Sequence, residues 1–313
     1  MKAIRLQAYG GPENLTIADI PRPEIAADEI LVRVLAAGIN PVDWKVRQGH
    51  LRALPAFPLP FTLGYDLSGV VEKTGKKVEN FAPGDEVFAM LDLSRPAAYA
   101  EYAAVKTGEA AAKPPALDYA RAAAVPLAAL TAWQCLFDIA GVQAGQKVLI
   151  HAAAGGVGHF AVQLARWAGA HVIGTASATN QEFLRRLGAH QVIDYTSQRF
   201  EEAVQEVDVV LDLLAGETRE RSWPVLKPGG ILVSTLPPAP PAEVLARYGV
   251  RGEIMLVRPD ARELGEIAIL IDEGKVRPEV TTFPLAEFQR AHRMSETGHT
   301  RGKLVLVVCE SSA

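Results

Sequence analysis

A glycine-rich turn constrains the fold of this chain more than any other segment. Residues 152–158 read Ala-Ala-Ala-Gly-Gly-Val-Gly. They follow a nearly continuous apolar run at 147–152, which is typical of a strand buried on both faces. They precede a segment in which apolar residues recur at helical spacing. A strand, a glycine turn and a helix in this order predict one unit of a parallel α/β sheet.

The same turn predicts a site for a dinucleotide. Gly155 allows the backbone to approach a pyrophosphate, and Gly158 allows the helix to pack closely on the strand. The free N–H groups at the start of the helix would hold the diphosphate charge, which adds Gly156 and Val157 to the expected cofactor contacts. Ala153 stands where the usual fingerprint has its first glycine. The alternative is therefore a turn that only packs a helix on a sheet.

The segment after the second predicted strand, 171–175, bears on the choice of cofactor. An NAD site usually places Asp or Glu about 20 residues after the glycines, whereas residues 175–180 read Thr-Ala-Ser-Ala-Thr-Asn. Without a carboxylate nothing repels a 2′-phosphate, and Ser177, Thr179 and Asn180 can donate hydrogen bonds to it. We therefore favour NADP. Because no Lys or Arg lies in this loop, NAD stays open as the alternative.

The pattern of the sequence changes near residue 119. Residues 1–118 carry short β-rich runs broken by Gly and Pro, which predict a compact antiparallel structure. From residue 119 strands alternate with helices, which predicts a parallel sheet with helices on both faces. This alternation ends with a strand expected at 254–257 and a helix at 261–271. The apolar run at 302–308 is again β and is expected to return to the first domain.

Composition excludes several classes of protein. The 313 residues carry a formal net charge of -4 without a basic block, which argues against nucleic-acid binding. Two cysteines, Cys135 and Cys309, exclude a disulfide scaffold and a four-cysteine zinc site. No run approaches the roughly 18 apolar residues that span a bilayer, and the N-terminus lacks the apolar core of a signal peptide. The expected location is the cytoplasm, with no membrane partner.

Two further segments, taken with the glycine turn, show a resemblance. Residues 38–45 read Gly-Ile-Asn-Pro-Val-Asp-Trp-Lys, and residues 64–71 read Gly-Tyr-Asp-Leu-Ser-Gly-Val-Val. Together the segments resemble the medium-chain dehydrogenase/reductase superfamily, in its zinc-independent branch of quinone oxidoreductases and alkenal reductases. The resemblance extends over nearly the whole chain, through to the closing Gly302-Lys303 pair.

This resemblance implies a fold and an assembly. The fold would be a Rossmann domain, a doubly wound parallel α/β sheet at residues 119–276, inserted in a GroES-like β-rich catalytic domain. The catalytic domain would comprise residues 1–118 and 277–313. Members of the branch are commonly homodimers, so we expect a homodimer.

The resemblance also implies a reaction. NADPH would deliver a hydride to a quinone or to the C=C bond of an α,β-unsaturated carbonyl. Zinc-dependent relatives place a cysteine ligand where this chain has Asn40 and a histidine ligand where it has Tyr65. We therefore expect no zinc, so hydrogen bonds must polarise the carbonyl. The alternatives are an enoyl-thioester reductase and a non-catalytic protein that binds or senses NADPH.

The resemblance implies catalytic roles for individual residues, and each role has an alternative. Asn40 would hold the nicotinamide amide or donate to the substrate oxygen, or else cap the helix that begins near Pro41. Lys45 would contact the cofactor, or be a solvated lysine. Tyr65 would donate a hydrogen bond into the cleft, or only pack. Asp43 is expected to be structural, and the proton donor is not identified.

Further cofactor contacts are expected from the resemblance and from the positions of strand ends. Thr131 resembles a threonine near the phosphates and Tyr195 a residue at the adenosine end; the alternatives are a buried helix hydroxyl and a loop aromatic. Three leucines follow strands at their carboxyl ends, where an open α/β sheet binds its ligand. They are Leu213, Leu214 and Leu236. The resemblance adds Lys303 to the cofactor contacts.

Overall fold

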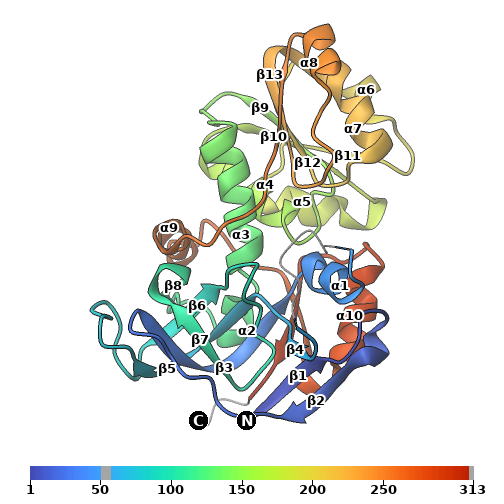
Figure 1. The fold of residues 1–313 in the computed structure, drawn as a ribbon. Helices are drawn as coiled ribbons and strands as arrows, with labels where there is room; N and C mark the ends of the chain where they lie inside the picture. Colours follow the sequence, from blue (N-terminus) through green and yellow to red (C-terminus); the bar gives the residue numbers. More distant parts are fainter. Residues whose placement is uncertain (51–57, 310–313) are drawn as a thin grey trace. The chain divides into compact units, whose positions relative to one another are not determined.

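The computed structural model describes residues 1–50 and 58–309 (Figure 1). The chain forms two compact units, both discontinuous in sequence. Unit 1 comprises Met1–Leu130, Arg258–Gly274 and Pro278–Ala313, and unit 2 comprises Thr131–Val257 and Lys275–Arg277.

Unit 1 is built mainly of antiparallel strands. They are β1 (Lys2–Leu6), β2 (Leu15–Asp19), β3 (Glu29–Ile39), β4 (Phe61–Thr62), β5 (Asp66–Thr74), β6 (Glu86–Met90), β7 (Tyr102–Lys106), β8 (Ala110–Ala112), β15 (Val280–Pro284) and β16 (Lys303–Val307). The larger sheet has the order β15-β16-β3-β5-β6-β8, with β7 also paired to β3, and the smaller sheet has the order β2-β1-β4. The expected antiparallel β structure is confirmed.

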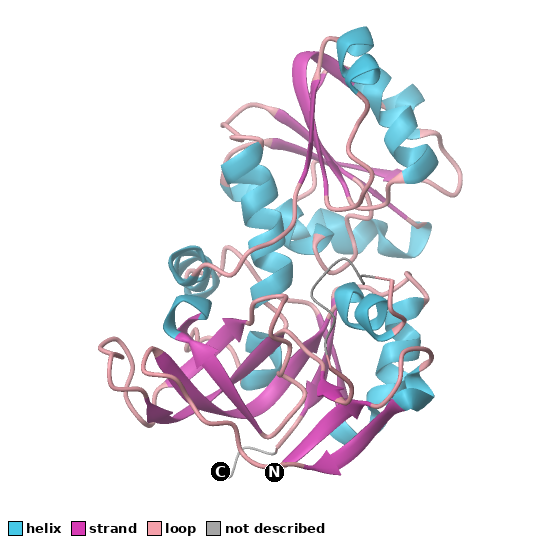
Figure 2. Cartoon of the chain, viewed as in Figure 1, coloured by secondary structure: helices cyan, strands magenta, loops and turns pink. Residues whose placement is uncertain are grey.

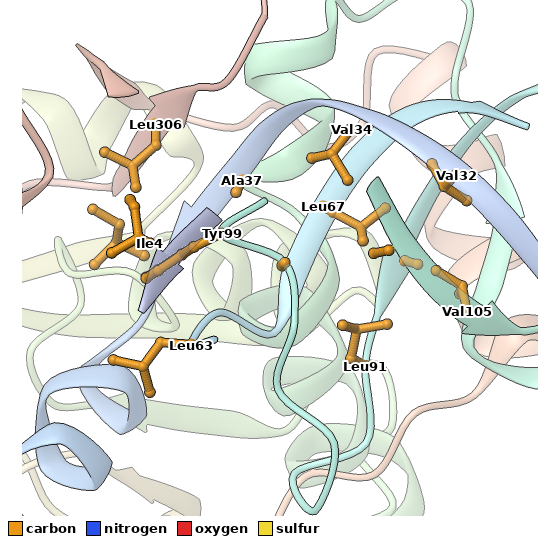
Figure 3. Packing of buried hydrophobic residues seen from close by; sticks show 14 of the residues in the cluster. Ile4, Val32, Val34, Ala37, Leu63, Leu67, Leu91, Tyr99, Val105 and Leu306 are labelled. Carbon is orange, nitrogen blue, oxygen red and sulfur yellow. The ribbon is translucent and has the colours of Figure 1, made fainter. Parts of the chain in front are cut away.

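The last strand of the chain returns to this unit, as the sequence predicts. β16 pairs antiparallel with β3, with Leu304 opposite Ile39 and Val307 opposite Ala36. Apolar side chains from both ends of the sequence therefore share one core. Figure 3 shows Ile4, Leu67, Tyr99 and Leu306 packed in it, all of them buried. The burial of this apolar surface holds the distant segments together.

Four helices pack within unit 1: α1 (Pro41–Arg47), α2 (Tyr119–Ala123), α9 (Ala261–Asp272) and α10 (Phe288–Glu296). Helix α2 packs on β3 and β5, and α9 packs on β8. These contacts give the units different limits from the domain limits expected at residues 118 and 276. The helices α2 and α9, which an α/β alternation would assign to the second domain, bury their apolar faces on the β-rich unit.

Unit 2 contains one parallel sheet. Its strands are β9 (Lys147–Ile150), β10 (His171–Ala176), β11 (Gln191–Asp194), β12 (Val207–Asp212), β13 (Leu226–Ser234) and β14 (Arg251–Ile254), in the order β11-β10-β9-β12-β13-β14. Helices flank the sheet (Figure 2): α4 (Gly158–Trp167), α5 (Gln181–Leu187), α6 (Phe200–Ala203), α7 (Gly216–Ser222) and α8 (Ala242–Tyr248). Helix α3 (Pro126–Trp133) crosses the boundary between the units. The expected doubly wound α/β fold is confirmed.

One strand of this sheet differs from its prediction. The apolar run suggested a strand at 254–257, but β14 spans Arg251–Ile254 and pairs with β13 from Ile231 to Ser234. An edge strand has neighbours on one side only, so it needs little apolar surface. Its polar sequence Arg-Gly-Glu-Ile therefore escaped the apolar pattern. Within the described residues, no helix combines the length and the apolar character that crossing a bilayer requires.

Candidate functional site

The glycine turn of unit 2 joins β9 to α4 as the sequence predicts. A Cβ added at Gly158 would lie 2.4 Å from the Ala152 carbonyl oxygen and 2.6 Å from the Ala153 Cα, so a larger residue would displace the helix. A Cβ at Gly155 would meet only the Ala152 oxygen, at 3.2 Å. The Ala152 backbone has a φ of 49°, a region that residues with a Cβ rarely adopt. The turn thus brings the helix start very close to the strand end.

The polar loop after β10 lies beside this turn. β10 pairs parallel with β9, and the Ala153 N–H donates to the Thr175 carbonyl at 3.1 Å, so the two strand ends are held together. The three predicted polar residues form one cluster. The Ser177 and Thr179 hydroxyls lie 3.1 Å apart, and Asn180 Nδ2 donates to Ser177 Oγ at 3.2 Å. This cluster and the glycine turn form one continuous polar edge of the sheet.

The remaining residues predicted in unit 2 fall into two groups. Tyr195 and Leu214 are about half exposed, and Leu213 and Leu236 are partly buried, all following strands at the carboxyl edge of the sheet. Because the sheet is parallel, these residues share the edge of the glycine turn. Thr131, by contrast, is buried in α3 with only 4% of its surface exposed.

In unit 1, Asn40 stands between the end of β3 and the start of α1. Its backbone N–H donates to Asp43 Oδ2 at 2.7 Å, and the Asp43 N–H donates to the Asn40 carbonyl at 3.0 Å. Helix α1 thus begins at Pro41, as the capping alternative predicts, but the carboxylate of Asp43 supplies the side-chain contact. The Asn40 side chain is left for other partners.

The Asn40 amide belongs to a buried polar cluster. Lys303 Nζ donates to Asn40 Oδ1, and Asn40 Nδ2 donates to Asp66 Oδ2 at 2.9 Å. An ammonium only donates and a carboxylate only accepts, so these two contacts fix which way the amide points. Asn40, Asp66 and Lys303 are 1%, 0% and 3% exposed. We call these three residues the Asn40 cluster.

Lys303 makes two further contacts in this cluster. Its ammonium also donates to the Ile39 carbonyl at 3.0 Å and lies 3.6 Å from Asp66 Oδ2. Three protein acceptors therefore face an ammonium with three protons. The cofactor contact expected for Lys303 stays a prediction, and the geometry makes Lys303 a partner of Asn40. Nothing local in the sequence shows this, because the two residues are 263 positions apart.

Burial dominates the protonation of this region. Burial raises the pKa of Asp66, despite the adjacent Lys303, and it raises the pKa of Asp43 to about 7. Burial also lowers the pKa of Lys303. Asp66 additionally accepts a hydrogen bond from the Leu127 N–H at 2.8 Å, which ties the start of α3 to the cluster. Removing these groups from water disfavours their charged forms.

Within the described residues, Tyr65 and Lys45 make their contacts outside the Asn40 cluster. Tyr65 is fully buried, and its hydroxyl donates to the Leu93 carbonyl at a long 3.4 Å. Burial raises the pKa of Tyr65, so the phenol stays neutral. Lys45 is partly buried on α1, which lowers its pKa, and its ammonium lies 5.6 Å from the Trp44 ring centroid. The full burial of Tyr65 and its single long contact favour the alternative in which the ring only packs.

Sequence reasoning did not single out Asp66. It lies inside the quoted segment 64–71, next to the apolar Leu67, at the start of a strand whose first residues are buried. A carboxylate among buried residues is rarely left without partners. That signal was available from the sequence. Among residues 1–50 and 58–309, no group of three or more His, Cys, Asp and Glu side chains could hold a metal ion.

Two family models match different parts of the chain. The alcohol dehydrogenase GroES-like domain matches residues 26–115, and the zinc-binding dehydrogenase family matches residues 187–306.

Individual relatives match nearly the whole chain. The chain is 36% identical to an NADPH-dependent alkenal/one oxidoreductase of Arabidopsis thaliana, over 98% of this chain and 79% of that protein. It is 32% identical to a quinone-oxidoreductase homolog of Spinacia oleracea, over 98% of each.

Solved structures agree with these matches. A quinone oxidoreductase from Coxiella burnetii superimposes with a TM-score of 0.90 and 39% identity, covering 99% of each chain. Escherichia coli quinone oxidoreductase complexed with NADPH superimposes with a TM-score of 0.89 and 30% identity, covering 98% of this chain and 100% of that one.

Proposed function

Since the chain belongs to the quinone oxidoreductase-like branch of the medium-chain dehydrogenase/reductase superfamily, we propose that it is an NADPH-dependent oxidoreductase. It reduces quinones or the C=C bond of α,β-unsaturated carbonyls. The observation that carries this proposal is the polar edge of unit 2, where a turn that requires glycine adjoins a loop with three polar side chains and no carboxylate.

The residues of that edge fit NADPH. The backbone of Gly155, Gly156, Val157 and Gly158 would hold the pyrophosphate at the start of α4. The absence of a Cβ at Gly158 lets that helix start lie close to the end of β9. Bound NADPH supplies a hydride. The 2′-phosphate would meet the polar loop, and the other contacts expected from the sequence complete the proposed set: Ser177, Thr179, Asn180, Lys45, Thr131, Tyr195, Leu213, Leu214 and Leu236.

Asn40 is the residue we propose to act on the substrate. Its Oδ1 is committed to Lys303 and one Nδ2 hydrogen to Asp66, and an amide nitrogen carries two hydrogens. The second hydrogen would donate to the substrate carbonyl oxygen, where negative charge builds as the hydride arrives. A donor whose orientation is already fixed stabilises that charge without reorganisation. Lys303 contributes by holding Asn40.

A catalytic zinc does not fit the residues present. Asn40 offers an amide oxygen that already accepts from the Lys303 ammonium, and burial keeps the Tyr65 phenol neutral. Zinc in proteins is bound by thiolate, imidazole and carboxylate ligands. The proposed reaction therefore uses no metal. Elemental analysis of the purified chain is expected to find far less than one zinc per chain, and a stoichiometric amount would overturn this part of the proposal.

The central experiment is NADPH oxidation by the purified full chain with a panel of quinones, alkenals and an enoyl thioester. We expect turnover with quinones or alkenals, and a loss of at least about tenfold in kcat/KM for Asn40→Ala. Turnover with the enoyl thioester alone would move the assignment to that class of reductase. Tight NADPH binding without turnover on any acceptor would indicate a binding or sensing protein.

The cofactor site is tested with a matched pair of glycine variants. We expect Gly158→Ala to weaken NADPH binding by at least about tenfold, because its Cβ meets backbone atoms that cannot move aside. The free energy of unfolding is measured for both variants, and we expect Gly158→Ala to lower it more than Gly155→Ala, whose Cβ would meet one backbone oxygen at 3.2 Å. If NADH binds wild type as tightly as NADPH, the preference argued from Ser177, Thr179 and Asn180 is wrong.

A homodimer and a cytoplasmic location complete the proposal. The dimer follows from what is common in the branch, and sedimentation of the purified chain tests it. Cell fractionation tests the location. Neither outcome affects the assignment of the reaction.

A further inference from the structure

A buried arginine in unit 2 joins two loops at the carboxyl edge of the sheet. Arg219 lies on α7 and is 4% exposed. Its Nε donates to Asp212 Oδ2 at 2.8 Å, at the end of β12, and its Nη2 donates to Ser234 Oγ at 2.6 Å, at the end of β13. It also donates to the carbonyls of Leu236 and Pro238, at 2.7 Å for the latter, in the loop that follows β13.

The partner of this arginine organises the loop that follows β12. Asp212 Oδ1 accepts from the N–H groups of Leu214 and Ala215, at 3.0 and 2.9 Å. Ala215 has a φ of 59°, a conformation that a residue with a Cβ adopts only where its surroundings impose it. The Ser234 hydroxyl donates to Asp212 Oδ2 at 2.8 Å, which closes the group. We call Asp212, Arg219 and Ser234 the Arg219 cluster.

Sheet order shows which part of the cofactor these loops face. The glycine turn follows β9 and the polar loop follows β10. Under the proposed function, the residues on this side of the edge would hold the pyrophosphate and the 2′-phosphate. β12 and then β13 lie on the other side of β9. A dinucleotide held at its pyrophosphate above β9 therefore extends its nicotinamide half toward the loops after β12 and β13.

We propose that Arg219 and Asp212 are positioning residues that fix both of these loops in the shape that receives the nicotinamide half of the cofactor. The assignment rests on the proposed function. The argument is that one guanidinium contacts both strand ends and two carbonyls of the second loop, while its carboxylate partner holds the first loop. Neither residue needs to touch the cofactor.

The test compares two arginines of the same helix. Arg219→Lys keeps the charge but loses the planar group that reaches four acceptors. Arg221→Gln is the matched control, because Arg221 pairs with Glu201 at 2.6 Å, is partly exposed and contacts neither loop in any described bond. Ser234→Ala removes one member of the cluster and serves if Arg219→Lys fails to fold. The wild type is measured alongside.

Two readouts separate positioning from general loosening. The first is amide hydrogen exchange of residues 212–216 and 234–241 without cofactor. The second is the affinity for NADPH against that for 2′,5′-ADP, which has the adenosine and the 2′-phosphate but no nicotinamide. For Arg219→Lys we expect faster exchange in both segments and about tenfold weaker NADPH binding, with the 2′,5′-ADP affinity within about twofold of wild type.

Other results overturn the proposal. Unchanged exchange in both segments, or an equal loss of affinity for both ligands, would show that Arg219 does not act on these loops specifically. The same changes in Arg221→Gln would show that any arginine of α7 suffices. A wild type that fails to bind NADPH would refute the proposed function, and the exchange data would still decide whether Arg219 fixes the loops.

Discussion

Each unit buries a cluster of charged groups. The pKa values of the carboxyl groups shift in opposite directions in the two units. In unit 2, Asp212 is fully buried, yet its pKa lies below the ordinary value. Burial acts to raise that pKa, but hydrogen bonds from Arg219, Leu214 and Ala215, and from Ser234, outweigh it. In unit 1, burial raises the pKa of both Asp66 and Asp43.

The number of donors explains the difference. Asp212 accepts four hydrogen bonds, from two backbone N–H groups, a guanidinium and a hydroxyl. Asp43 accepts one, from the Asn40 N–H, and its Oδ1 has no hydrogen-bond partner among the described residues. The Tyr99 hydroxyl interacts with Asp43 and lowers its pKa, but forms no hydrogen bond of ordinary geometry. Asp66 accepts two, from the Asn40 amide and the Leu127 N–H. Asp212 therefore has the most donors of the three carboxyls, which favours its charged form.

The largest expected effect comes from removing the cation of the fully paired cluster. Arg219→Met leaves the Asp212 carboxylate buried and uncompensated, so we expect the free energy of unfolding of unit 2 to fall by about 3–5 kcal/mol. Urea denaturation measures this. Arg221→Gln, which breaks a partly exposed pair, is the control. A loss below about 1 kcal/mol for Arg219→Met would contradict the view that donors keep Asp212 ionised.

The pH dependence of stability should differ in sign between the units. The folded chain holds a proton on Asp43 up to about pH 7, whereas the unfolded chain releases it near the ordinary value of 3.8. Asp43 therefore lowers the free energy of unfolding as the pH rises between these values, by at most about 4 kcal/mol.

Asp43→Asn removes this titration and leaves an oxygen to accept from the Asn40 N–H. We expect the variant to match wild type near pH 4 and to gain stability relative to it toward pH 8, in urea denaturation at several pH values. Asp212 acts oppositely, since its contribution is lost as the pH falls through its lowered pKa. A difference between Asp43→Asn and wild type that does not change with pH would show that Asp43 is ionised in the folded chain.

Removing the cation of the other cluster should cost less. In Lys303→Met, the Asp66 carboxyl can take up a proton, because burial already raises its pKa. We expect a loss of about 1–3 kcal/mol, smaller than for Arg219→Met and larger at pH 8 than at pH 5. The measurement is the same denaturation at both pH values. If Lys303→Met lost as much free energy of unfolding at pH 5 as Arg219→Met does, protonation of Asp66 would not compensate for the missing cation.

The smallest effect is expected at Tyr65. Its hydroxyl makes one long contact, to the Leu93 carbonyl at 3.4 Å, so Tyr65→Phe should change the free energy of unfolding by less than about 1 kcal/mol. We also expect kcat/KM to stay within about twofold of wild type. A tenfold fall with unchanged stability would restore the catalytic role that the sequence suggested for this residue.

The sequence predicts unit 2 well because its signals are local. Strand β9 (Lys147–Ile150) lies in the apolar run at 147–152, and β10 (His171–Ala176) matches the strand predicted at 171–175. Periodicity, turns and capping operate over a few residues, so a single chain shows them. The edge strand β14 escaped this logic, because its residues are exposed or only partly buried and include one large apolar side chain, Ile254.

The two charged clusters were not predictable in the same way. Arg219 reaches partners up to 19 residues away, at the ends of two strands and in the loop after β13, and Lys303 reaches Asn40 across 263 residues. Nothing in the local pattern around either cation distinguishes it from a solvated one. The glycine turn and the loop at 177–180 were predictable because strand pairing brings adjacent strand ends together. That Asn40, Asp66 and Lys303 are buried together could be seen only in the tertiary structure.

The pairing of β16 with β3 also has a consequence for synthesis. Residues 131–257 emerge from the ribosome as one continuous stretch that contains the whole parallel sheet, and β16 emerges only after them. Until then, residues 36–39 of β3 lack their β16 partner and Asn40 lacks Lys303. An unpaired strand edge can join another chain. The arrival of the last strand therefore covers this edge of β3 and brings Lys303 to Asn40 in the same step.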